Sequence, residues 1–267
     1  MRARIPHPTR GSVALVTGAS SGIGRELARQ LAARGHDLVL VARRRERLEQ
    51  LAEELRSGHG TRVDAIPCDV ARPESREALD QEVASLALTV DVLVLSAGLG
   101  MGGEFIAQES EQLQRMMRTN VEGVVSVTGL FAPGMAKRRR GAILIVSSLA
   151  GNQPIARSGV YAATKAAVTS FGEALHEELR PTGVAVTVLC PGAVATEFAE
   201  VAAMEETMRR LPATMVASAE GTARAGLDAL DRGRRHVVPG RGSQLLHFAG
   251  GHAPRGLWLR ASNRLTV

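Results

Sequence analysis

The stretch TGASSGIG, residues 17–24, follows a short apolar run and leads directly into a segment of helical periodicity. A strand, a glycine-rich turn and a helix in this order begin a βαβ unit. Gly18 permits the tight turn, Gly22 lets the backbone approach a pyrophosphate, and Gly24 lets helix and strand pack closely. Because the helix N-terminus adds N–H groups and a positive dipole end, the stretch predicts a dinucleotide site.

Apolar runs and helical segments alternate along most of the chain. The runs predict strands at 12–17, 37–42, 62–67, 91–95, 142–147, 184–190 and 235–238. Helical periodicity predicts helices at 22–34, 44–57, 73–86, 109–136 with a break, 158–180 and 218–230. The nearly continuous apolar character of the runs indicates strands covered on both faces. We therefore expect an α/β fold, a Rossmann-type doubly wound sheet of about seven parallel strands with helices on both faces.

Length and composition fit this fold. The chain of 267 residues is long enough for one large α/β domain. We expect a tail at 1–11, a single catalytic domain at 12–240 and a C-terminal extension at 241–267. The two cysteines, Cys68 and Cys190, suggest no disulfide framework, and the seven histidines show no ligand spacing, so no metal is predicted. A cytoplasmic location fits best.

The net charge of +6 raises the question of a nucleic-acid partner. Arginines cluster at 43–45 and 138–140, and the alternative is that they are solvated helix ends and loops. The chain has one Trp, one Tyr and five Phe, so no aromatic residues interleave with the arginines to stack on bases. We expect no nucleic-acid partner. No apolar stretch reaches the roughly 20 residues of a membrane span.

The glycine spacing, Gly-x3-Gly-x-Gly after a threonine, resembles that of the short-chain dehydrogenase/reductase family. Tyr161-Ala-Ala-Thr-Lys165 matches the family's Tyr-x3-Lys motif, and Ser148 lies thirteen residues before the tyrosine. Asn120 falls where the family uses an asparagine that interrupts a helix and holds a water linked to the lysine; by itself it would be an ordinary helical or capping residue. The resemblance covers about 12–240 and implies an oxidoreductase with Asn120, Ser148, Tyr161 and Lys165 as its catalytic residues.

The chemistry of these residues is consistent with that role. Tyr161 and Lys165 are four apart, so on a helix they share one face. Because a neighbouring ammonium favours the phenolate, Lys165 is expected to lower the pKa of Tyr161 from about 10 into the range of a working acid or base. Ser148 could donate a hydrogen bond to the substrate oxygen. The alternative, an ordinary surface pair, is disfavoured because Tyr161 is the only tyrosine and Lys165 one of two lysines.

The end of the second predicted strand bears on the choice of cofactor. A carboxylate usually stands there in NAD-preferring sites, whereas this chain has Ala42, Arg43 and Arg44. Guanidinium groups bind phosphate strongly, so NADP(H) is favoured and NAD(H) is the alternative. We expect Arg43 to contact the 2′-phosphate, Arg44 to cover the adenine and Ser20 to assist. The arginines could instead merely start a charged helix.

The resemblance implies further cofactor contacts. Pro191-Gly192 with Thr196 matches the motif that holds the nicotinamide carboxamide, and Asp69 resembles the adenine-side aspartate, although a helix cap before Pro73 would look similar. The expected cofactor-binding residues are Gly18, Ser20, Ser21, Gly22, Ile23, Gly24, Arg43, Arg44, Asp69, Val70, Ala97, Gly98, Tyr161, Lys165, Pro191, Gly192, Val194 and Thr196.

One segment departs from the family pattern. After the fourth strand the family usually has Asn-Asn-Ala-Gly, whereas this chain has Leu95-Ser96-Ala97-Gly98. A serine cannot make all the hydrogen bonds of an amide, so the stability of the sheet centre or the position of the adenosine is expected to differ.

Substrate determinants are expected in three loops beyond the strand ends, 99–106, 149–155 and 193–214. Their apolar side chains are Leu99, Met101, Phe105, Ile155, Phe198, Met204 and Met208. Because the loops hold little that could fix a charged group, we expect a moderately apolar ketone, aldehyde or alcohol. Such residues serve packing equally often.

The C-terminal extension mixes apolar residues with Arg255, Arg260 and Arg264. It is expected to form a lid or a subunit interface; membrane contact is the disfavoured alternative. The resemblance also implies a homodimer or homotetramer built through the helices at 109–136 and 158–180.

Two classes of function are therefore considered. The first is a reductase or dehydrogenase that passes a hydride between nicotinamide and a carbonyl carbon, with Tyr161 exchanging the proton. The second is a non-catalytic dinucleotide-binding regulatory or scaffold protein. The complete catalytic set favours the enzyme, since a scaffold would not need it. An epimerase or dehydratase is disfavoured because such enzymes have longer chains.

Overall fold

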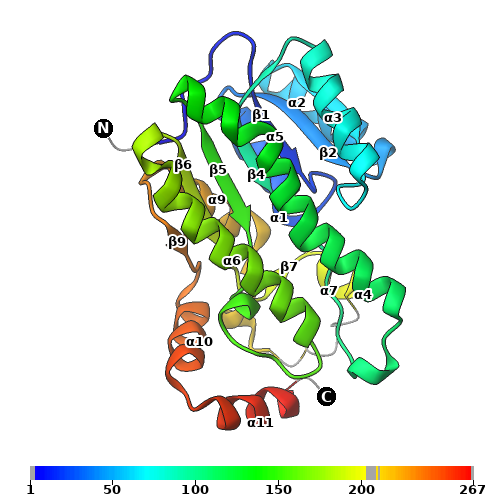
Figure 1. Ribbon diagram of the computed structural model, residues 1–267, viewed down its shortest axis with the longest axis vertical. Coiled ribbons are helices and arrows are strands. Elements are labelled where there is room, and N and C mark those ends of the chain that lie inside the picture. Colours follow the sequence, from blue (N-terminus) through cyan, green and yellow to red (C-terminus); the bar gives the residue numbers. More distant parts are fainter. Residues whose placement is uncertain (1–3, 203–208, 210, 266–267) are drawn as a thin grey trace.

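A seven-stranded parallel sheet forms the centre of the protein. The structure is a computed structural model and describes residues 4–202, 209 and 211–265 (Figure 1). The strands are β1 (Ser12–Thr17), β2 (Asp37–Ala42), β3 (Val63–Pro67), β4 (Thr89–Leu95), β5 (Ala142–Val146), β6 (Ala185–Leu189) and β9 (His236–Val237). Their order is β3-β2-β1-β4-β5-β6-β9, and every pair is parallel. The predicted doubly wound α/β sheet is confirmed. The chain adds β2 and β3 on one side of β1 and then places β4 on the other side, so the strand order reverses between β1 and β4. Doubly wound sheets bind their ligands at this point, beyond the carboxyl ends of the strands.

Helices cover both faces of the sheet. They are α1 (Gly22–Ala33), α2 (Arg45–His59), α3 (Pro73–Ser85), α4 (Ser110–Met117), α5 (Gly123–Arg138), α6 (Gly159–Leu179) and α9 (Ala219–Asp231). One buried cluster contains α1, α2 and α9, and the other contains α3, α5 and α6. Figure 1 shows α5 and α6 in front of the sheet. The predicted break in the fourth helical segment is a π-helical turn, Arg118–Glu122, between α4 and α5.

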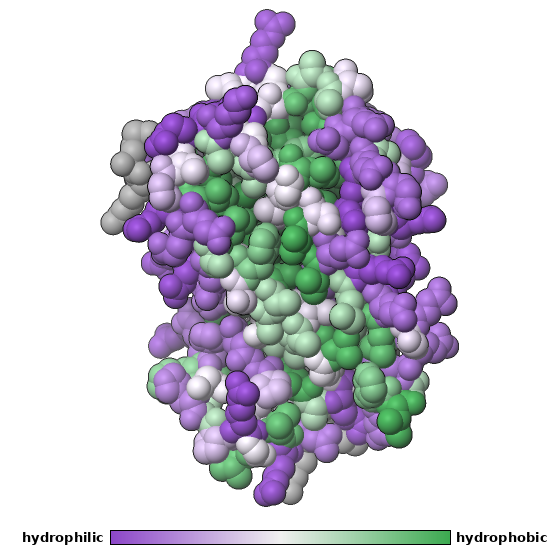
Figure 2. All heavy atoms as spheres, viewed as in Figure 1, coloured by the Kyte–Doolittle hydropathy of each residue, from purple (hydrophilic) through white to green (hydrophobic). Residues whose placement is uncertain are grey.

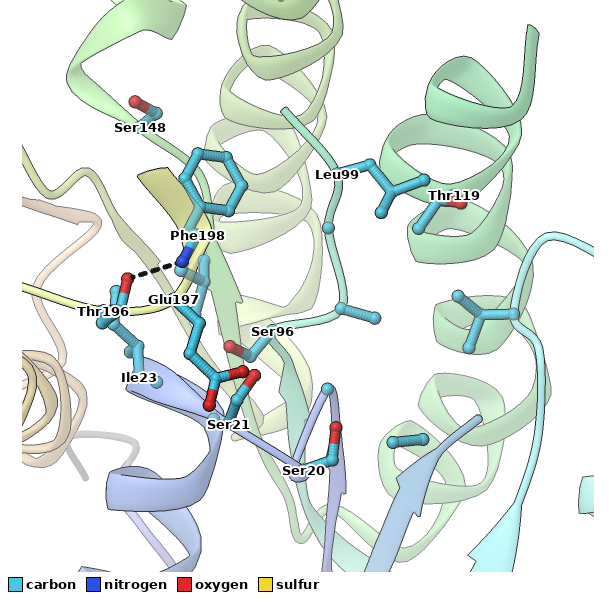
Figure 3. A pocket seen from close by; sticks show the side chains of 18 of the residues that line it. Ser20, Ser21, Ile23, Ser96, Leu99, Thr119, Ser148, Thr196, Glu197 and Phe198 are labelled. Atoms are coloured by element: carbon cyan, nitrogen blue, oxygen red, sulfur yellow. Dashed lines mark hydrogen bonds between the residues drawn. The ribbon is translucent and has the colours of Figure 1, made fainter. Parts of the chain in front are cut away.

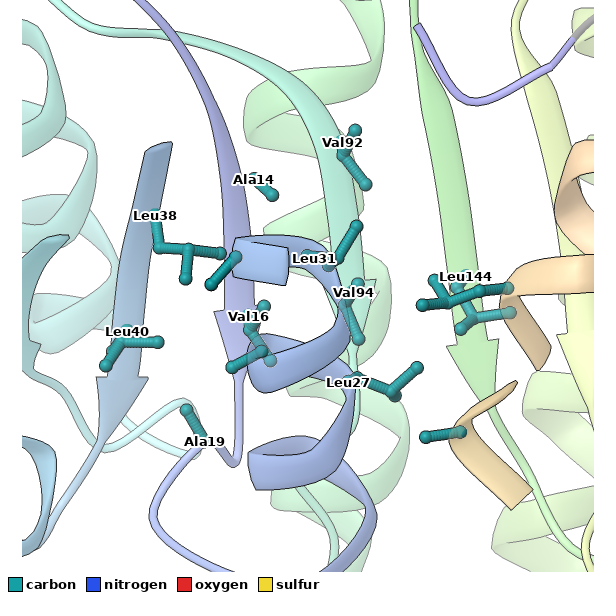
Figure 4. Packing of buried hydrophobic residues seen from close by; sticks show 14 of the residues in the cluster. Ala14, Val16, Ala19, Leu27, Leu31, Leu38, Leu40, Val92, Val94 and Leu144 are labelled. Atoms are coloured by element: carbon teal, nitrogen blue, oxygen red, sulfur yellow. The ribbon is translucent and has the colours of Figure 1, made fainter. Parts of the chain in front are cut away.

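The alternation of side chains along the strands explains the continuous apolar runs. Ala14 and Val16 of β1 pack with Leu27 and Leu31 of α1 (Figure 4). The intervening residues of β1 belong to the cluster on the opposite face of the sheet. Because both faces are buried, the strand has no solvent-facing positions that would need polar residues.

Several elements at the carboxyl end of the sheet were not predicted. They include a two-stranded sheet of β7 (Val194–Ala195) and β8 (Ala217–Ser218), the short helix α7 (Phe198–Val201), and the C-terminal helices α10 (Arg241–His252) and α11 (Arg255–Leu265). Helix α10 rests directly on the chain after β6, since a Cβ on Gly192 would lie 2.3 Å from the Ser243 Oγ. No helix in the described ranges combines the length and apolarity needed to cross a membrane.

Candidate cofactor and active site

A cavity of about 260 Å³ lies at the carboxyl ends of the strands (Figure 3). The cofactor-binding residues predicted from the sequence all line this one cavity: Gly18, Ser20, Ser21, Gly22, Ile23, Gly24, Arg43, Arg44, Asp69, Val70, Ala97, Gly98, Tyr161, Lys165, Pro191, Gly192, Val194 and Thr196. Ser148 lines it too, and Asn120 lies fully buried outside the lining. Further lining residues, which we did not predict to bind the cofactor, include Thr119, Glu197 and Phe198.

The glycine-rich turn has the shape that a dinucleotide needs. Gly18 and Gly22 adopt positive φ values of 69° and 54°. A Cβ on Gly24 would lie 2.3 Å from the carbonyl oxygen of Gly18, so only glycine lets α1 pack this close to the turn. The side chain of Ser21, the N-cap of α1, makes no capping hydrogen bond. The first N–H groups of α1 therefore suit a pyrophosphate, and the turn fits the predicted cofactor.

Thr17 holds the segment after β4 beside this turn. Its Oγ1 accepts hydrogen bonds from the backbone N–H groups of Ser96 (3.1 Å) and Ala97 (3.2 Å) and donates to the carbonyl of Val94 (3.3 Å). We did not predict this positioning role, although a polar residue at the end of an apolar run was a signal for it. Thr17 thus holds the backbone at Ser96, the residue that replaces the asparagine usual in the family.

The two arginines after β2 have different surroundings. The Arg44 guanidinium donates to the Ser20 Oγ (3.0 Å) and the Ser21 Oγ (3.1 Å) and pairs with Glu197 at 3.5 Å. Arg47 also pairs with Glu197, at 2.7 Å, and this contact holds the pKa of the Glu197 carboxyl below its usual value. Arg43 is exposed and has no hydrogen bond or ion pair within the described part of the chain. Arg43 is therefore the arginine left free for a phosphate.

Tyr161 and Lys165 lie on one face of α6, as predicted, but their electrostatics differ from the prediction. Burial raises the pKa of Tyr161 to about 12, while a hydrogen bond with Ser148 acts in the lowering direction. Burial lowers the pKa of Lys165 to about 8. The Lys165 Nζ lies 5.9 Å from the Tyr161 ring centre and donates to the Val146 carbonyl at 3.1 Å. The prediction that Lys165 lowers the tyrosine pKa is wrong for this geometry, because desolvation dominates both groups.

The two serines after β5 have separate roles. The Ser147 Oγ donates to the Lys165 carbonyl at 3.0 Å and lies 2.7 Å from the Thr169 Oγ1, so it is committed to α6. Ser148 starts the 3₁₀ turn Leu149–Asn152, accepts a hydrogen bond from the Ala150 N–H at 3.1 Å, and interacts with the Tyr161 hydroxyl. Only Ser148 is thus placed beside the tyrosine, in line with its selection by sequence spacing.

Asn120 lies in the π-helical turn, and its side chain is fully buried. Its Oδ1 accepts from the Leu99 N–H at 2.8 Å, and its Nδ2 donates to the Leu99 carbonyl at 2.8 Å and to the Thr164 Oγ1 at 3.0 Å. The amide therefore ties the chain after β4 to α6, the helix that carries the tyrosine. Single π-helical turns of this kind are frequent at functional sites.

Asp69 also lines the cavity. Its Oδ1 accepts from the Ala71 N–H at 3.1 Å, and its Oδ2 pairs with Arg115 at 3.2 Å. The alternative that it caps the following helix is wrong, because the N-cap of α3 is Arg72.

Apolar side chains from the predicted substrate loops surround the tyrosine. The Phe198 ring centre lies 5.8 Å from that of Tyr161. Leu99, Met101, Ile155 and Phe198 pack in the same small cluster as the tyrosine. Phe105 is 67% exposed and does not belong to this cluster. Met204 and Met208 lie outside the described residues.

Comparison with known proteins identifies the family. The sequence profile described as short chain dehydrogenase matches residues 12–207. The chain belongs to the short-chain dehydrogenase family. Members of this family are oxidoreductases, and this protein is an enzyme that acts on CH–OH or C=O groups with NAD(P).

Individual relatives of this short-chain dehydrogenase are similar over most of its length. A putative ketoacyl reductase 1 of the granaticin polyketide synthase, from Streptomyces violaceoruber, is 42% identical over 190 residues, 70% of each chain. The NADP-dependent 3-hydroxy acid dehydrogenase YdfG of Salmonella typhi is 40% identical over 194 residues, which cover 71% of this chain and 75% of the relative.

Solved structures agree with this assignment. A short-chain dehydrogenase from Sphingobium yanoikuyae in complex with NADPH has a TM-score of 0.80 and 33% identity, covering 92% of this chain and 94% of the other. A family member from Burkholderia phymatum in complex with NAD has a TM-score of 0.78 and 28% identity, covering 85% and 88%. Both nicotinamide cofactors thus occur among the structural neighbours of this short-chain dehydrogenase.

Proposed function

We propose that this short-chain dehydrogenase interconverts a moderately apolar ketone or aldehyde and the corresponding alcohol, with NADP(H) preferred over NAD(H). The unengaged guanidinium of Arg43 and the absence of a carboxylate at the end of β2 support this preference. A relative named as NADP-dependent and a neighbour complexed with NADPH support it as well. The neighbour complexed with NAD keeps NAD(H) as the alternative.

The catalytic residues have separate roles in this proposal. NADPH, when bound, supplies the hydride. Tyr161, with a pKa of about 12, keeps its proton at neutral pH and donates it to the carbonyl oxygen during reduction. Ser148, beside the tyrosine hydroxyl, donates a hydrogen bond to the same oxygen as charge develops on it. Lys165, with a pKa of about 8, is mainly charged at pH 7, and its Nζ lies 5.9 Å from the centre of the Tyr161 ring. This charge favours the phenolate that Tyr161 becomes, but it does not offset the burial that raises the tyrosine pKa.

Two residues support this arrangement without touching the reacting atoms. Asn120 holds Leu99 and Thr164, and so keeps the chain after β4 in register with the helix of the tyrosine. The second is Gly98, since a Cβ at this position would lie 3.4 Å from the Lys165 Nζ. A small residue at position 98 therefore keeps space for the ammonium group.

The substrate class follows from the wall beside Tyr161. Leu99, Met101, Ile155 and Phe198 present apolar surface there, and none of them can hold a charged group. Relatives named as a ketoacyl reductase and a 3-hydroxy acid dehydrogenase act on substrates with a carbonyl or a hydroxyl group. We infer a ketone or aldehyde with an apolar substituent next to the carbonyl.

Residues 12–240 form the catalytic domain in this proposal, and residues 241–267 extend it. We also infer a homodimer or homotetramer that forms through α5 and α6. Figure 2 shows a band of hydrophobic residues on the face that these two helices cover, and Val125 of α5 is 43% exposed. Burial of such a band against a second copy would remove apolar surface from water.

The observation that carries the proposal is the placement of the Tyr161 and Ser148 hydroxyls together in the lining of the glycine-rich cavity. The test is a fluorescence titration with NADPH and NADH, followed by a panel of apolar aldehydes and ketones assayed at the nicotinamide absorbance. We expect tighter NADPH binding and carbonyl-dependent oxidation of NADPH. Tyr161→Phe should reduce turnover at least roughly 100-fold and leave NADPH binding within about a factor of three, because it removes only the proton donor.

Two results would contradict the proposal. NADPH oxidation by Tyr161→Phe at the wild-type rate would exclude the acid role. Tight NADPH binding without turnover of any carbonyl would favour the non-catalytic alternative, which nothing in the site or the relatives supports.

A further inference from the structure

The positive charge of the protein is concentrated at its C-terminal end. Residues 1–231 hold 26 arginines and lysines against 27 acidic residues, whereas residues 232–267 hold seven arginines and no acidic residue. The segment 232–267 therefore carries a charge of +7 and residues 1–231 a charge of −1, which together give the net charge of +6. Three of its arginines precede β9, and the other four belong to α10 and α11. These two helices are a basic element attached to a nearly neutral enzyme.

Three arginines of these helices are exposed and make no ion pair with the described residues. Arg241, Arg255 and Arg260 are all exposed to solvent. No ion pair or hydrogen bond joins any of the three side chains to the described residues. Their charges are thus available to a partner outside this chain.

Helix α10 has one face that packs on the enzyme and one that does not. Ser243 and Leu246 face inward, Ser243 against Gly192 and Leu246 in a small buried cluster. The outward face carries Arg241, Leu245 and Phe248, which follow one another at helical spacing. Leu245 and Phe248 are 65% and 62% exposed. This helix is therefore amphipathic in an unusual sense, since its solvent face combines apolar and basic side chains.

Helix α11 repeats this arrangement after the turn at Pro254. Trp258 faces inward and donates its indole N–H to the Pro154 carbonyl at 3.0 Å, and Ser262 is buried. Leu257, 61% exposed, and Arg260 lie on the outer side. Half of the large apolar side chains that the described residues expose belong to α10 and α11. In Figure 1 the two helices lie together at the lower end of the molecule, and Figure 2 shows hydrophobic and hydrophilic residues mixed there.

Two kinds of partner could cover apolar and basic side chains together. A second copy of this chain, docked about a two-fold axis, would place the same patch against itself. The arginines of both copies would then meet without an acidic residue from either C-terminal segment, so repulsion opposes this pairing. The surface of an anionic bilayer offers acyl chains for the leucines and the phenylalanine, and negative head groups for the arginines.

In place of the lid or subunit interface expected from the sequence, we propose that the outer face of α10 and α11 docks on anionic phospholipid bilayers, with Leu245, Phe248 and Leu257 in the interface and Arg241, Arg255 and Arg260 on the head groups. The helices lie in the plane of the membrane surface and do not cross it. Helix α10 also packs against the 3₁₀ turn after Ser148, so the docked face adjoins the active-site end of the sheet. The enzyme would thereby meet apolar substrates dissolved in the bilayer.

The test is sedimentation of the full chain with vesicles of phosphatidylcholine alone or mixed with phosphatidylglycerol. We expect association with the mixed vesicles only, and its loss at about 1 M salt, where charges are screened within about 3 Å. The triple variant Arg241→Gln, Arg255→Gln, Arg260→Gln should lower the partition coefficient roughly 100-fold. The variant Leu245→Ser, Phe248→Ser should lower it at least about 10-fold.

Matched controls separate this docking from a general charge or hydrophobic effect. The triple variant Arg45→Gln, Arg180→Gln, Arg224→Gln removes the same charge from exposed positions outside α10 and α11, and Ile106→Ser removes an apolar side chain that is 91% exposed. Both controls should bind the mixed vesicles like the wild type. Trp258, the only tryptophan, reports on α11 independently of activity: its emission should change with mixed vesicles and not with neutral ones.

Any of four results would overturn the proposal. The first is no association with mixed vesicles at about 0.1 M salt, and the second is equal loss in the control and test triple variants. The third is a lipid-free oligomer that dissociates in Leu245→Ser, Phe248→Ser, which would identify a second copy as the partner. The fourth is binding to a DNA duplex as tight as to vesicles and insensitive to the apolar substitutions, which would assign the arginines to nucleic acid.

Discussion

Lys165 holds its charge inside the protein at a cost to the folded state, so Lys165→Met should stabilise the fold while it impairs turnover. Burial lowers the pKa of Lys165 from 10.5 to about 8, and the side chain is only 5% exposed. At about 1.4 kcal/mol per pH unit, this shift corresponds to about 3 kcal/mol of destabilisation while the group is charged. The variant loses the hydrogen bond to the Val146 carbonyl, worth about 1 kcal/mol. The net gain at pH 7 is therefore about 2 kcal/mol.

The pH dependence follows from the direction of the shift. Because the pKa of Lys165 is lower in the folded than in the unfolded state, the penalty is complete below about pH 8 and disappears as the pH rises towards 10.5. The advantage of Lys165→Met should therefore shrink over this window. Tyr161 is present in both proteins, so the destabilisation caused by its raised pKa above pH 10 largely cancels in the comparison.

The assay is urea unfolding of wild type and variant at pH 7 and near pH 10, with the free energy of unfolding extrapolated to water. Lys137→Met is the matched control, since Lys137 is the other lysine of the chain and is exposed. The control should change stability by less than about 0.5 kcal/mol at either pH. A Lys165→Met variant less stable than wild type at pH 7, or a difference that does not change with pH, would refute the reasoning.

Three further predictions concern the cofactor site. Arg43→Ala should weaken NADPH binding roughly 10- to 100-fold and NADH binding less than about threefold, because a charge-assisted bond to the 2′-phosphate is lost. In isothermal titration, the control variant Arg45→Ala, at an exposed neighbouring position, should bind both cofactors like the wild type. Equal losses for NADPH and NADH in Arg43→Ala would exclude Arg43 as the residue that contacts the 2′-phosphate. Gly24→Ala should destabilise the protein by about 1–3 kcal/mol, since the new Cβ would lie 2.3 Å from the Gly18 carbonyl oxygen. Thermal melts should show no loss of stability for the control variant Gly58→Ala, because a Cβ at Gly58 has no neighbour within 4 Å. The kcat/KM for NADPH should fall as the pH rises through about 8, where the free enzyme loses the Lys165 charge, and a flat profile from pH 6 to 10 would contradict this.

Strand positions were predicted to within two residues because their cause is local. Each strand of a doubly covered parallel sheet must be apolar on both faces, and this requirement appears as an uninterrupted run in the sequence. The sequence did not predict β7 and β8, because each has two residues and neither forms part of an apolar run rich in Val, Leu or Ile. β9 is equally short, but its Val237 and the adjoining Val238 form part of the run RHVV. The sequence did not predict the helices α10 and α11, because their outer faces carry apolar side chains where an exposed helix face usually carries polar ones.

The lining of the cavity was also predictable, because the residues that follow parallel strands meet at one edge of the sheet. The functions of neighbouring residues within it were less so. Arg43 and Arg44 are adjacent and chemically identical, yet one is unengaged and the other is bound to Ser20, Ser21 and Glu197. Glu197 was missed for the same reason, since no local pattern marks a carboxylate that pairs across the fold.

The sequence alone determined the α/β class, the dinucleotide turn and the Tyr161 and Lys165 pair, because these depend on spacing along one strand, turn or helix. Only the tertiary structure decided the direction of the Tyr161 and Lys165 pKa shifts, which arise from the burial of α6 against the sheet. It also decided which arginine stays free for a phosphate, through a carboxylate more than 150 residues away in the chain. Desolvation and long-range pairing are properties of the folded packing, and no local pattern of residues encodes them.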